Sequence, residues 1–336
     1  MNQLRLRKCR CNALVVACSP LQLVNSLEFL HDEGICLSNV IVVFSGKNDN
    51  IGKLKQAENL LSIFSPYAVF WHMRYRKLPR LIRVLRLSKL IMPVLRAYNK
   101  VRFQFIVKKL SADLNPAWLV GFGPYLDLAK AYFPEASTCI VDGGSSSLYG
   151  QLTKGRVNHN VYFSIYSPYD IGIDPALYRK NRCSLRRDRL AGLPFDSNIG
   201  VFISANIKGN FTGSAWYDRL LEKAVSMHDG NLIYFKRGNE PVTDAIKICE
   251  QHGMRFVEIS LPVEDFVTYE LGCIPGSVFS VASSAMWFFG SDLFRGRCVN
   301  YCLIPKSYEN EKFHNQVITL MKLAEERSIS VNFVKI

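Results

Sequence analysis

Asp142 is the residue whose type and position best suit catalysis. It follows the apolar run at residues 138–141 (Thr-Cys-Ile-Val) and precedes Gly143 and Gly144. An apolar run that stops at an acid and two glycines is typical of a buried parallel strand, and open α/β sheets bind ligands at the carboxyl ends of such strands. Asp142 can therefore act as a general base. The alternative is a helix cap or an Asx-turn.

The elements needed to position such a carboxylate alternate along the first half of the chain. Strands are predicted at residues 13–18, 40–45, 67–71, 117–121 and 138–141, and helices at 23–30, 56–64 and 125–132. This alternation predicts a parallel, doubly wound α/β sheet. No GxGxxG motif follows the first strand, which argues against a dinucleotide-binding fingerprint.

A second series of α/β elements follows a stretch rich in Gly and Pro at residues 190–197. Strands are predicted at 199–204, 231–235 and 255–259 and helices at 216–227, 242–252 and 309–326; further apolar elements fall at 277–281, 285–289 and 299–303. We therefore predict two domains, 1–192 and 193–336. The outline resembles the GT-B glycosyltransferase layout, two Rossmann-like domains facing a central cleft, although other two-domain α/β enzymes would share it.

Composition narrows the class of protein further. The 336 residues are 49% hydrophobic, as expected of globular domains. The ten cysteines form no CxxC pair, so we expect reduced thiols in a cytosolic protein and no structural metal site. No apolar run reaches the roughly 18 to 20 residues that span a bilayer, and the N-terminus does not resemble a signal peptide.

Much of the formal charge of +14 comes from residues 74–109, which hold twelve cations and no acid among many aliphatic side chains. Arg76, Arg80, Arg83 and Arg86 fall near one helical face. A basic amphipathic segment of this kind is suited to an anionic membrane surface. A nucleic-acid groove is a weaker alternative because stacking aromatics and nucleic-acid motifs are missing. The segment can also be a solvated helix face over the core.

Four short motifs occur along the chain: Ser-Pro-Leu-Gln at 19–22, Asp-Gly at 142–143, Pro-Val-Glu at 262–264 and Ser-Ser at 283–284. Together they resemble those of the bacterial sialyltransferases of the lipooligosaccharide and polysialic acid type. Their order and rough spacing agree over residues 19–284. The first resembles the family's Ser-Pro-Leu-Gln opening (Ser19-Pro20-Leu21-Gln22), and the second its acid-acid-Gly motif (Asp142-Gly143), with Val141 in place of the first acid. The third resembles its Pro-x-Glu element (Pro262-Val263-Glu264), and the fourth its paired serines (Ser283-Ser284).

The resemblance implies a role for each motif. Asp142 deprotonates the acceptor hydroxyl, Glu264 binds the ribose of CMP, and Ser283 with Ser284 holds the CMP phosphate. Further residues are expected around the two substrates: Lys236, Ser204 and Asn206 on the donor side, and Ser19, Gln22 and Gly143 on the sugar or acceptor side. The first domain is then the acceptor side and the second binds the CMP-sugar. Ser19 and Gln22 can equally be turn and cap residues.

One motif departs from the family. Relatives carry Lys-Pro-His-Pro, whose histidine is the general acid, whereas this chain has Gly238 at that position after Lys236 and Arg237. Three interpretations follow: Arg237 takes over by charge stabilisation, the donor differs, or the protein is inactive. Arg237 can also be a surface cation beside Glu240. Among the six histidines, His159 is the only substitute worth testing.

The implied activity is an inverting, metal-independent transfer of sialic acid or a related nonulosonic acid from its CMP donor. The acceptor is a hydroxyl of a bacterial surface glycan, in O-antigen, capsule or lipooligosaccharide. No cofactor is expected. The basic segment predicts a peripheral location on the inner face of the cytoplasmic membrane, with a lipid-linked acceptor. A glycosyltransferase with another nucleotide sugar, and a non-catalytic basic protein that binds membrane or nucleic acid, are the alternatives.

Overall fold

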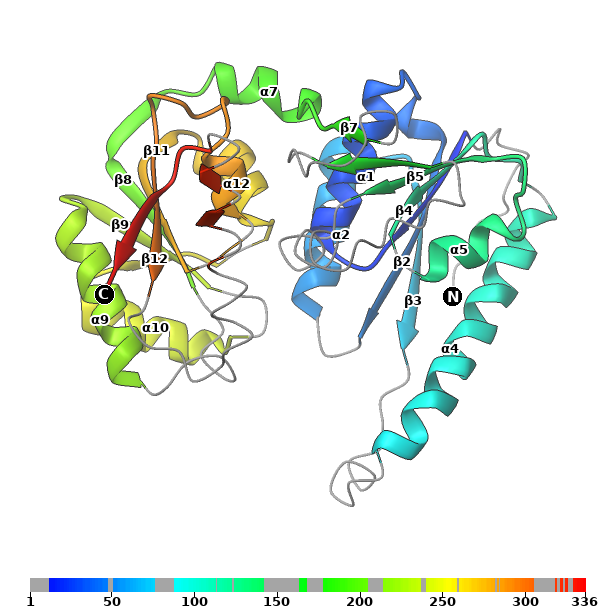
Figure 1. Cartoon of the computed structure of the whole chain (residues 1–336), viewed down its shortest axis with the longest axis horizontal. Coiled ribbons are helices and arrows are strands. Elements are labelled where there is room, and N and C mark those ends of the chain that lie inside the picture. The colour runs from blue at the N-terminus through cyan, green and yellow to red at the C-terminus, as the bar shows by residue number, and fades with distance from the viewer. Residues whose placement is uncertain are drawn as a thin grey trace. The chain divides into compact units, whose positions relative to one another are not determined.

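The structure is a computed structural model. It describes residues 12–47, 51–75, 88–112, 114–122, 124–141, 163–167, 178–204, 214–236, 240–258, 260–281, 283, 285–304, 318, 321–322, 324–325 and 329–336. Within these ranges the chain divides into two compact units, residues 12–184 and 185–336. Each unit is built on its own parallel sheet (Figure 1).

The first unit contains a sheet of seven strands in the order β3-β2-β1-β4-β5-β6-β7, all paired in parallel. The order reverses between β1 and β4, which makes their carboxyl ends the switch point where such sheets bind ligands. The strands are β1 (Ala13–Ala17), β2 (Val40–Lys47), β3 (Val69–Tyr75), β4 (Trp118–Gly121), β5 (Ser137–Val141), β6 (Phe163–Ser167) and β7 (Tyr178–Lys180).

Helices cover both faces of this sheet, with α1 and α2 on one side and α4 and α5 on the other (Figure 1). Every residue of β1 is buried, as expected of a central parallel strand. Leu14 and Val16 pack with Phe103 and Val107 of α4 and Leu126 of α5. The helical elements are α1 (Pro20–Asp32), the 3₁₀ turn η1 (Leu37–Asn39), α2 (Ile51–Phe64), α4 (Ser88–Ser111) and α5 (Pro124–Lys130).

The second unit contains six parallel strands in the order β10-β9-β8-β11-β12-β13, with the reversal between β8 and β11. The strands are β8 (Phe195–Ile203), β9 (Asn231–Phe235), β10 (Arg255–Phe256), β11 (Ile274–Ser280), β12 (Val299–Ile304) and β13 (Asn332–Lys335). The helices are α7 (Ser184–Ala191), α9 (Ser214–Met227), α10 (Val242–His252), α11 (Val263–Phe266), the π-helical turn η2 (Val267–Leu271) and α12 (Ala285–Phe289).

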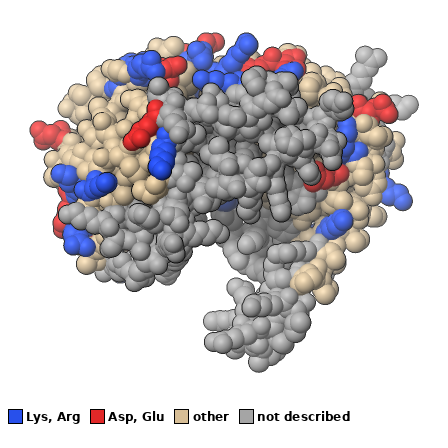
Figure 2. Space-filling model, in the orientation of Figure 1, with Lys and Arg blue, Asp and Glu red and all other residues tan. Residues whose placement is uncertain are grey.

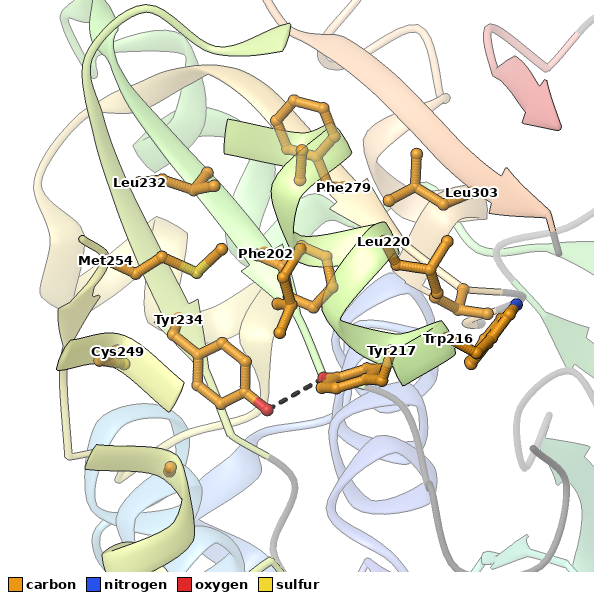
Figure 3. Packing of buried hydrophobic residues seen from close by; sticks show 14 residues of the cluster. Phe202, Trp216, Tyr217, Leu220, Leu232, Tyr234, Cys249, Met254, Phe279 and Leu303 are labelled. Carbon is orange, nitrogen blue, oxygen red and sulfur yellow. Dashed lines mark hydrogen bonds between the residues drawn. The ribbon is translucent and has the colours of Figure 1, made fainter. Parts of the chain in front are cut away.

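An aromatic core joins α9 and α10 to one face of the second sheet (Figure 3). The rings of Phe202 and Tyr234 stack with centroids 5.8 Å apart, and Tyr217 meets Phe202 edge-on at 6.1 Å. On the opposite face Phe235 contacts Phe266 of α11 at 5.6 Å. This contact brings the first turn of α11 close to the carboxyl end of β9.

The division between the units precedes the predicted boundary at 192/193. Ser184 hydrogen-bonds His31 and Asp32 of α1, whereas the Tyr269 hydroxyl donates to the Leu185 carbonyl at 3.1 Å. The Gly-Pro stretch forms the turn between α7 and β8, where the Gly192 amide donates to carbonyls of the helix. Gly and Pro mark a turn inside a domain as readily as a linker.

The predicted α/β alternation is confirmed in both units, with several differences. β6, β7 and β13 were not predicted, and β3 continues to Tyr75 beyond the predicted 67–71. Within 74–109, residues 76–87 lie outside the described part of the chain, and α4 accounts for the remainder from Ser88. The predicted helix at 309–326 lies largely outside it as well. Among the described residues no helix is long and apolar enough to cross a membrane.

Candidate functional site

Several of the predicted donor-side residues follow strands of the second sheet at the same edge. Ser204 follows β8, Lys236 follows β9, and Ser283 comes shortly after β11. The Ser204 amide donates to the Phe235 carbonyl at 3.0 Å, which extends the pairing of β8 and β9 to their last residues. Because all these strands are parallel, their carboxyl ends share one edge that includes the switch point between β8 and β11.

Glu240 connects three polar side chains at this edge. The Ser204 hydroxyl donates to its Oε2 at 2.7 Å, and the Tyr234 hydroxyl donates to its Oε1 at 2.6 Å. Lys236 Nζ donates to the Glu240 backbone carbonyl at 3.1 Å. Both carboxylate oxygens are thus held, and Ser204 is turned toward Glu240. From the sequence, Glu240 was noted only as a neighbour of Arg237.

The Glu240 hydrogen bonds continue into the aromatic core. The hydroxyls of Tyr217 and Tyr234 are 2.9 Å apart (Figure 3). Because the single proton of Tyr234 goes to Glu240, Tyr217 must donate to Tyr234. Burial, followed by the neighbouring Tyr217 and then by the charge of Glu240, raises the pKa of Tyr234, so its hydroxyl stays protonated and remains a donor. A rigid core therefore fixes the position of the Glu240 carboxylate.

Glu264 lies in the first turn of α11 and is 6% exposed. Burial raises the pKa of its carboxyl group, while its own amide and the Arg186 guanidinium act in the opposite direction. Arg186 of α7 is itself buried, 4.9 Å above the Phe288 ring and 3.9 Å from Asp265 Oδ1. The charge of Arg186 thus opposes, without cancelling, the effect of burial on the pKa of Glu264. Neither Arg186 nor Asp265 was predicted from the sequence.

The end of β11 carries two serines with different surroundings. Ser283 is half-buried; its hydroxyl accepts from the Ala285 amide at 3.3 Å and its carbonyl from Met286 at 3.2 Å, so it caps α12. Ser280, the last residue of β11, is completely buried, and its hydroxyl has no hydrogen-bond partner among the described residues. Ser280 was not predicted as a site residue because it lies inside an apolar strand.

The Ser-Pro-Leu-Gln motif of the first unit forms a reciprocal helix cap. The Ser19 hydroxyl accepts from the Gln22 amide at 3.2 Å, and Gln22 Oε1 accepts from the Cys18 amide at 2.7 Å. Pro20 occupies the first turn of α1, where its missing N–H costs no hydrogen bond. The cap explains the residue types of this motif at the carboxyl end of β1. A cap of this kind was the structural alternative to a binding role for Ser19 and Gln22.

The remaining predicted residues lie outside the described part of the chain. β5 ends at Val141, so the strand expected before Asp142 is confirmed. The residues outside are Asp142, Gly143, Asn206, Arg237 and Ser284, together with His159. Among the described residues no group of three His, Cys, Asp or Glu side chains could hold a metal ion.

Comparison with known proteins supports the fold. No family model and no curated protein matches the chain. The solved structure of Arabidopsis thaliana UGT89C1 complexed with UDP is 13% identical in sequence, with a TM-score of 0.51. The match covers 96% of this chain and 86% of the UGT89C1 chain. A UDP-N-acetylglucosamine 2-epimerase is 10% identical and covers 96% and 91%, also with a TM-score of 0.51. The predicted fold class is confirmed: the chain has the GT-B fold, with two Rossmann-like domains.

Proposed function

We propose that this chain is an inverting glycosyltransferase that moves sialic acid, or a related nonulosonic acid, from its CMP donor to a hydroxyl of a bacterial surface glycan. The observation that carries the proposal is the set of polar side chains at one edge of the second sheet. Ser204, Lys236 and Ser283 follow three of its strands, and Glu264 begins the helix packed against the end of β9. This edge is where a Rossmann-like domain binds a nucleotide.

Each donor-side residue has a chemical task in this proposal. A carboxylate can accept hydrogen bonds from the two ribose hydroxyls, which is the role of Glu264 beside the cation Arg186. Lys236 supplies positive charge toward the phosphate, and Ser283 supplies a hydroxyl. Their proposed neighbours along the chain are Arg237, Ser284 and Asn206. Ser204 acts through Glu240, to which it is hydrogen-bonded.

The acceptor side is assigned to the first unit. Asp142 follows β5 and takes the proton from the acceptor hydroxyl, with Gly143 leaving room for the sugar. Ser19 and Gln22, at the carboxyl end of β1, border the transferred sugar or the acceptor while they cap α1. The acceptor belongs to O-antigen, capsule or lipooligosaccharide.

The proposed reaction is a single in-line displacement. The acceptor oxygen forms a bond to the anomeric carbon as its proton passes to Asp142, and the bond to the CMP phosphate oxygen breaks with its electron pair. CMP leaves as an anion that needs charge stabilisation more than a proton, and the guanidinium of Arg237 provides it. We expect inversion, no cofactor, and activity that resists EDTA because no step uses a metal ion.

The proposed place of action is the inner face of the cytoplasmic membrane. There the enzyme would act on a lipid-linked acceptor, and the basic segment 74–109 is suited to the anionic surface of that membrane. Nucleic acid is not a proposed partner.

A nucleotide screen tests the proposed donor. We expect CMP to raise the melting temperature of the protein more than UDP or GDP does, and calorimetry to show weaker CMP binding for Glu264→Ala than for Glu250→Ala, an exposed acid on α10. Unchanged CMP affinity in Glu264→Ala would refute its ribose role. Stabilisation by UDP alone would favour a transferase with another sugar donor, a second candidate suggested by the UDP bound to UGT89C1.

A further inference from the structure

Helix α4 has apolar side chains on two opposite faces. On the inner face Phe103 and Val107 are completely buried and Leu110 is 1% exposed, packed against the first sheet and α5. On the outer face Val94, Tyr98, Val101 and Phe105 are 66%, 38%, 61% and 71% exposed. The spacing of this outer row, with steps of four, three and four residues, aligns its members along one side of a helix.

Cations border the outer row. By helical position Arg102 and Lys109 lie along one edge of the row and Lys108 along the other, and Arg102 lies 5.9 Å from the Tyr98 ring. Residues 88–111 contain no acid. In Figure 2 the part of the lower right surface that is not grey is tan, with a blue cluster above it.

A solvated helix face would carry polar side chains where α4 carries valine, tyrosine and phenylalanine. Four of the large apolar side chains that are exposed in the described part of the chain belong to this one row. An apolar row with a positive border matches the boundary between acyl chains and anionic headgroups. A second copy of the chain would instead bring equal positive charges together.

We propose that the row Val94-Tyr98-Val101-Phe105 is a membrane-docking surface that enters the headgroup region of an anionic bilayer while Arg102, Lys108 and Lys109 contact the lipid phosphates. This deepens the proposed membrane location by naming the surface that makes the contact. The apolar side chains supply the binding energy that survives at high salt, and the cations supply the salt-sensitive part.

Co-sedimentation with vesicles of phosphatidylcholine and phosphatidylglycerol tests the proposal without any sugar substrate, so its outcome is independent of the donor and the acceptor. We expect Val101→Ser/Phe105→Ser to lower the partition coefficient by about ten-fold or more. Lys108→Gln/Lys109→Gln should lower it by about three- to ten-fold at low salt and have little effect at high salt.

Matched controls come from the second unit. Val242→Ser/Ile246→Ser removes an exposed apolar pair of α10, where the side chains are 44% and 38% exposed. Lys223→Gln/Lys247→Gln removes the same charge from exposed positions. Both control variants should bind vesicles like the wild type. Circular dichroism and melting temperature verify that each variant is folded, as expected for exposed positions.

Two results would overturn the proposal. One is vesicle binding by Val101→Ser/Phe105→Ser equal to that of its α10 control. The other is a dimer of the wild type, seen by light scattering, that the same substitutions dissociate, because the row would then be covered by a second copy.

Discussion

Ser204 and Glu240 are joined by a hydrogen bond of 2.7 Å between the end of β8 and the residues that lead into α10. The same carboxylate accepts from Tyr234, so one acid fixes the ends of β8 and β9 to the buried aromatic core. Lys236 is tied to the backbone of this acid. We therefore propose that Glu240 positions Ser204 and Lys236 in the candidate donor site.

Replacing Glu240 by glutamine tests this position. The amide has one oxygen, so either Ser204 or Tyr234 loses its acceptor, and an unsatisfied buried hydroxyl costs about 1–3 kcal/mol. We expect urea unfolding to show a loss of this size, and the donor KM to rise several-fold while kcat changes less. Glu250→Gln, at an exposed position of α10, is the control. Equal stability and equal donor KM in the two variants would contradict the role.

Arg186 is expected to be essential to the stability of the second unit. Its guanidinium is buried between Asp265 and the Phe288 ring, so Arg186→Met leaves buried acids without their cation. Breaking a buried charge cluster of this kind costs about 3–5 kcal/mol. Arg186→Lys should recover only part of the loss because a lysine lacks the planar group that stacks on the ring.

The control for Arg186 is its exposed neighbour on α7, Arg187→Met. Chemical denaturation of both variants should separate them clearly. An unfolding free energy for Arg186→Met within about 1 kcal/mol of that of Arg187→Met would show that the buried cluster is not stabilising.

Glu264 should make the stability of the protein depend on pH. Its folded pKa lies above the ordinary value of 4.5, so the folded state holds more protons than the unfolded state in the window just above that value. The contribution of Glu264 to the unfolding free energy therefore falls as pH rises through this window. Glu264→Gln cannot ionise, so the variant should gain stability relative to the wild type as the pH rises above 4.5.

Urea denaturation of both proteins at several pH values measures this difference. A difference that stays constant would show that the folded pKa of Glu264 is not raised, and a wild type that gains on the variant as pH rises would show that the Arg186 charge outweighs burial.

Asp142→Asn tests the proposed base. An asparagine cannot take the proton, and loss of general-base assistance should lower kcat by about 10²- to 10⁴-fold while CMP binding stays unchanged. Asp127→Asn, at an exposed position on α5, should keep wild-type turnover. A variant at 142 with more than a tenth of wild-type turnover would mean that another group is the base.

The sequence predicts the central strands well because buried parallel strands are continuous apolar runs. β1, β2, β4, β5 and β9 all contain such runs, whereas β8 begins at Phe195, before the predicted 199, and only its second half is a buried apolar run. β6 was missed because Tyr and Ser interrupt its pattern and Pro168 follows it, and β7 because it has only three residues. Short strands at the edge of a sheet depend on pairing with neighbouring strands, and this pairing cannot be predicted from local composition.

The candidate site is harder to predict from the sequence than the fold is. Ser204 was identified because it ends a predicted strand, and Lys236 because it matches the lysine of the family's Lys-Pro-His-Pro motif. The link from Ser204 through Glu240 to Tyr234 and Tyr217 is a tertiary feature. In the sequence, Arg186 is one of several cations in a basic stretch, and only the structure shows that it is buried. Conversely, the helix cap formed by Ser19 and Gln22 is local in sequence and could be predicted from the motif.

The most direct test of the proposed function is to incubate the purified protein with CMP-sialic acid and a panel of galactosides. We predict transfer of the sialyl group with inversion at the anomeric carbon, in the presence of EDTA, and its loss in Asp142→Asn. Absence of any product, combined with transfer from a UDP-sugar to the same acceptors, would contradict the assignment of a CMP-linked nonulosonic acid as the donor.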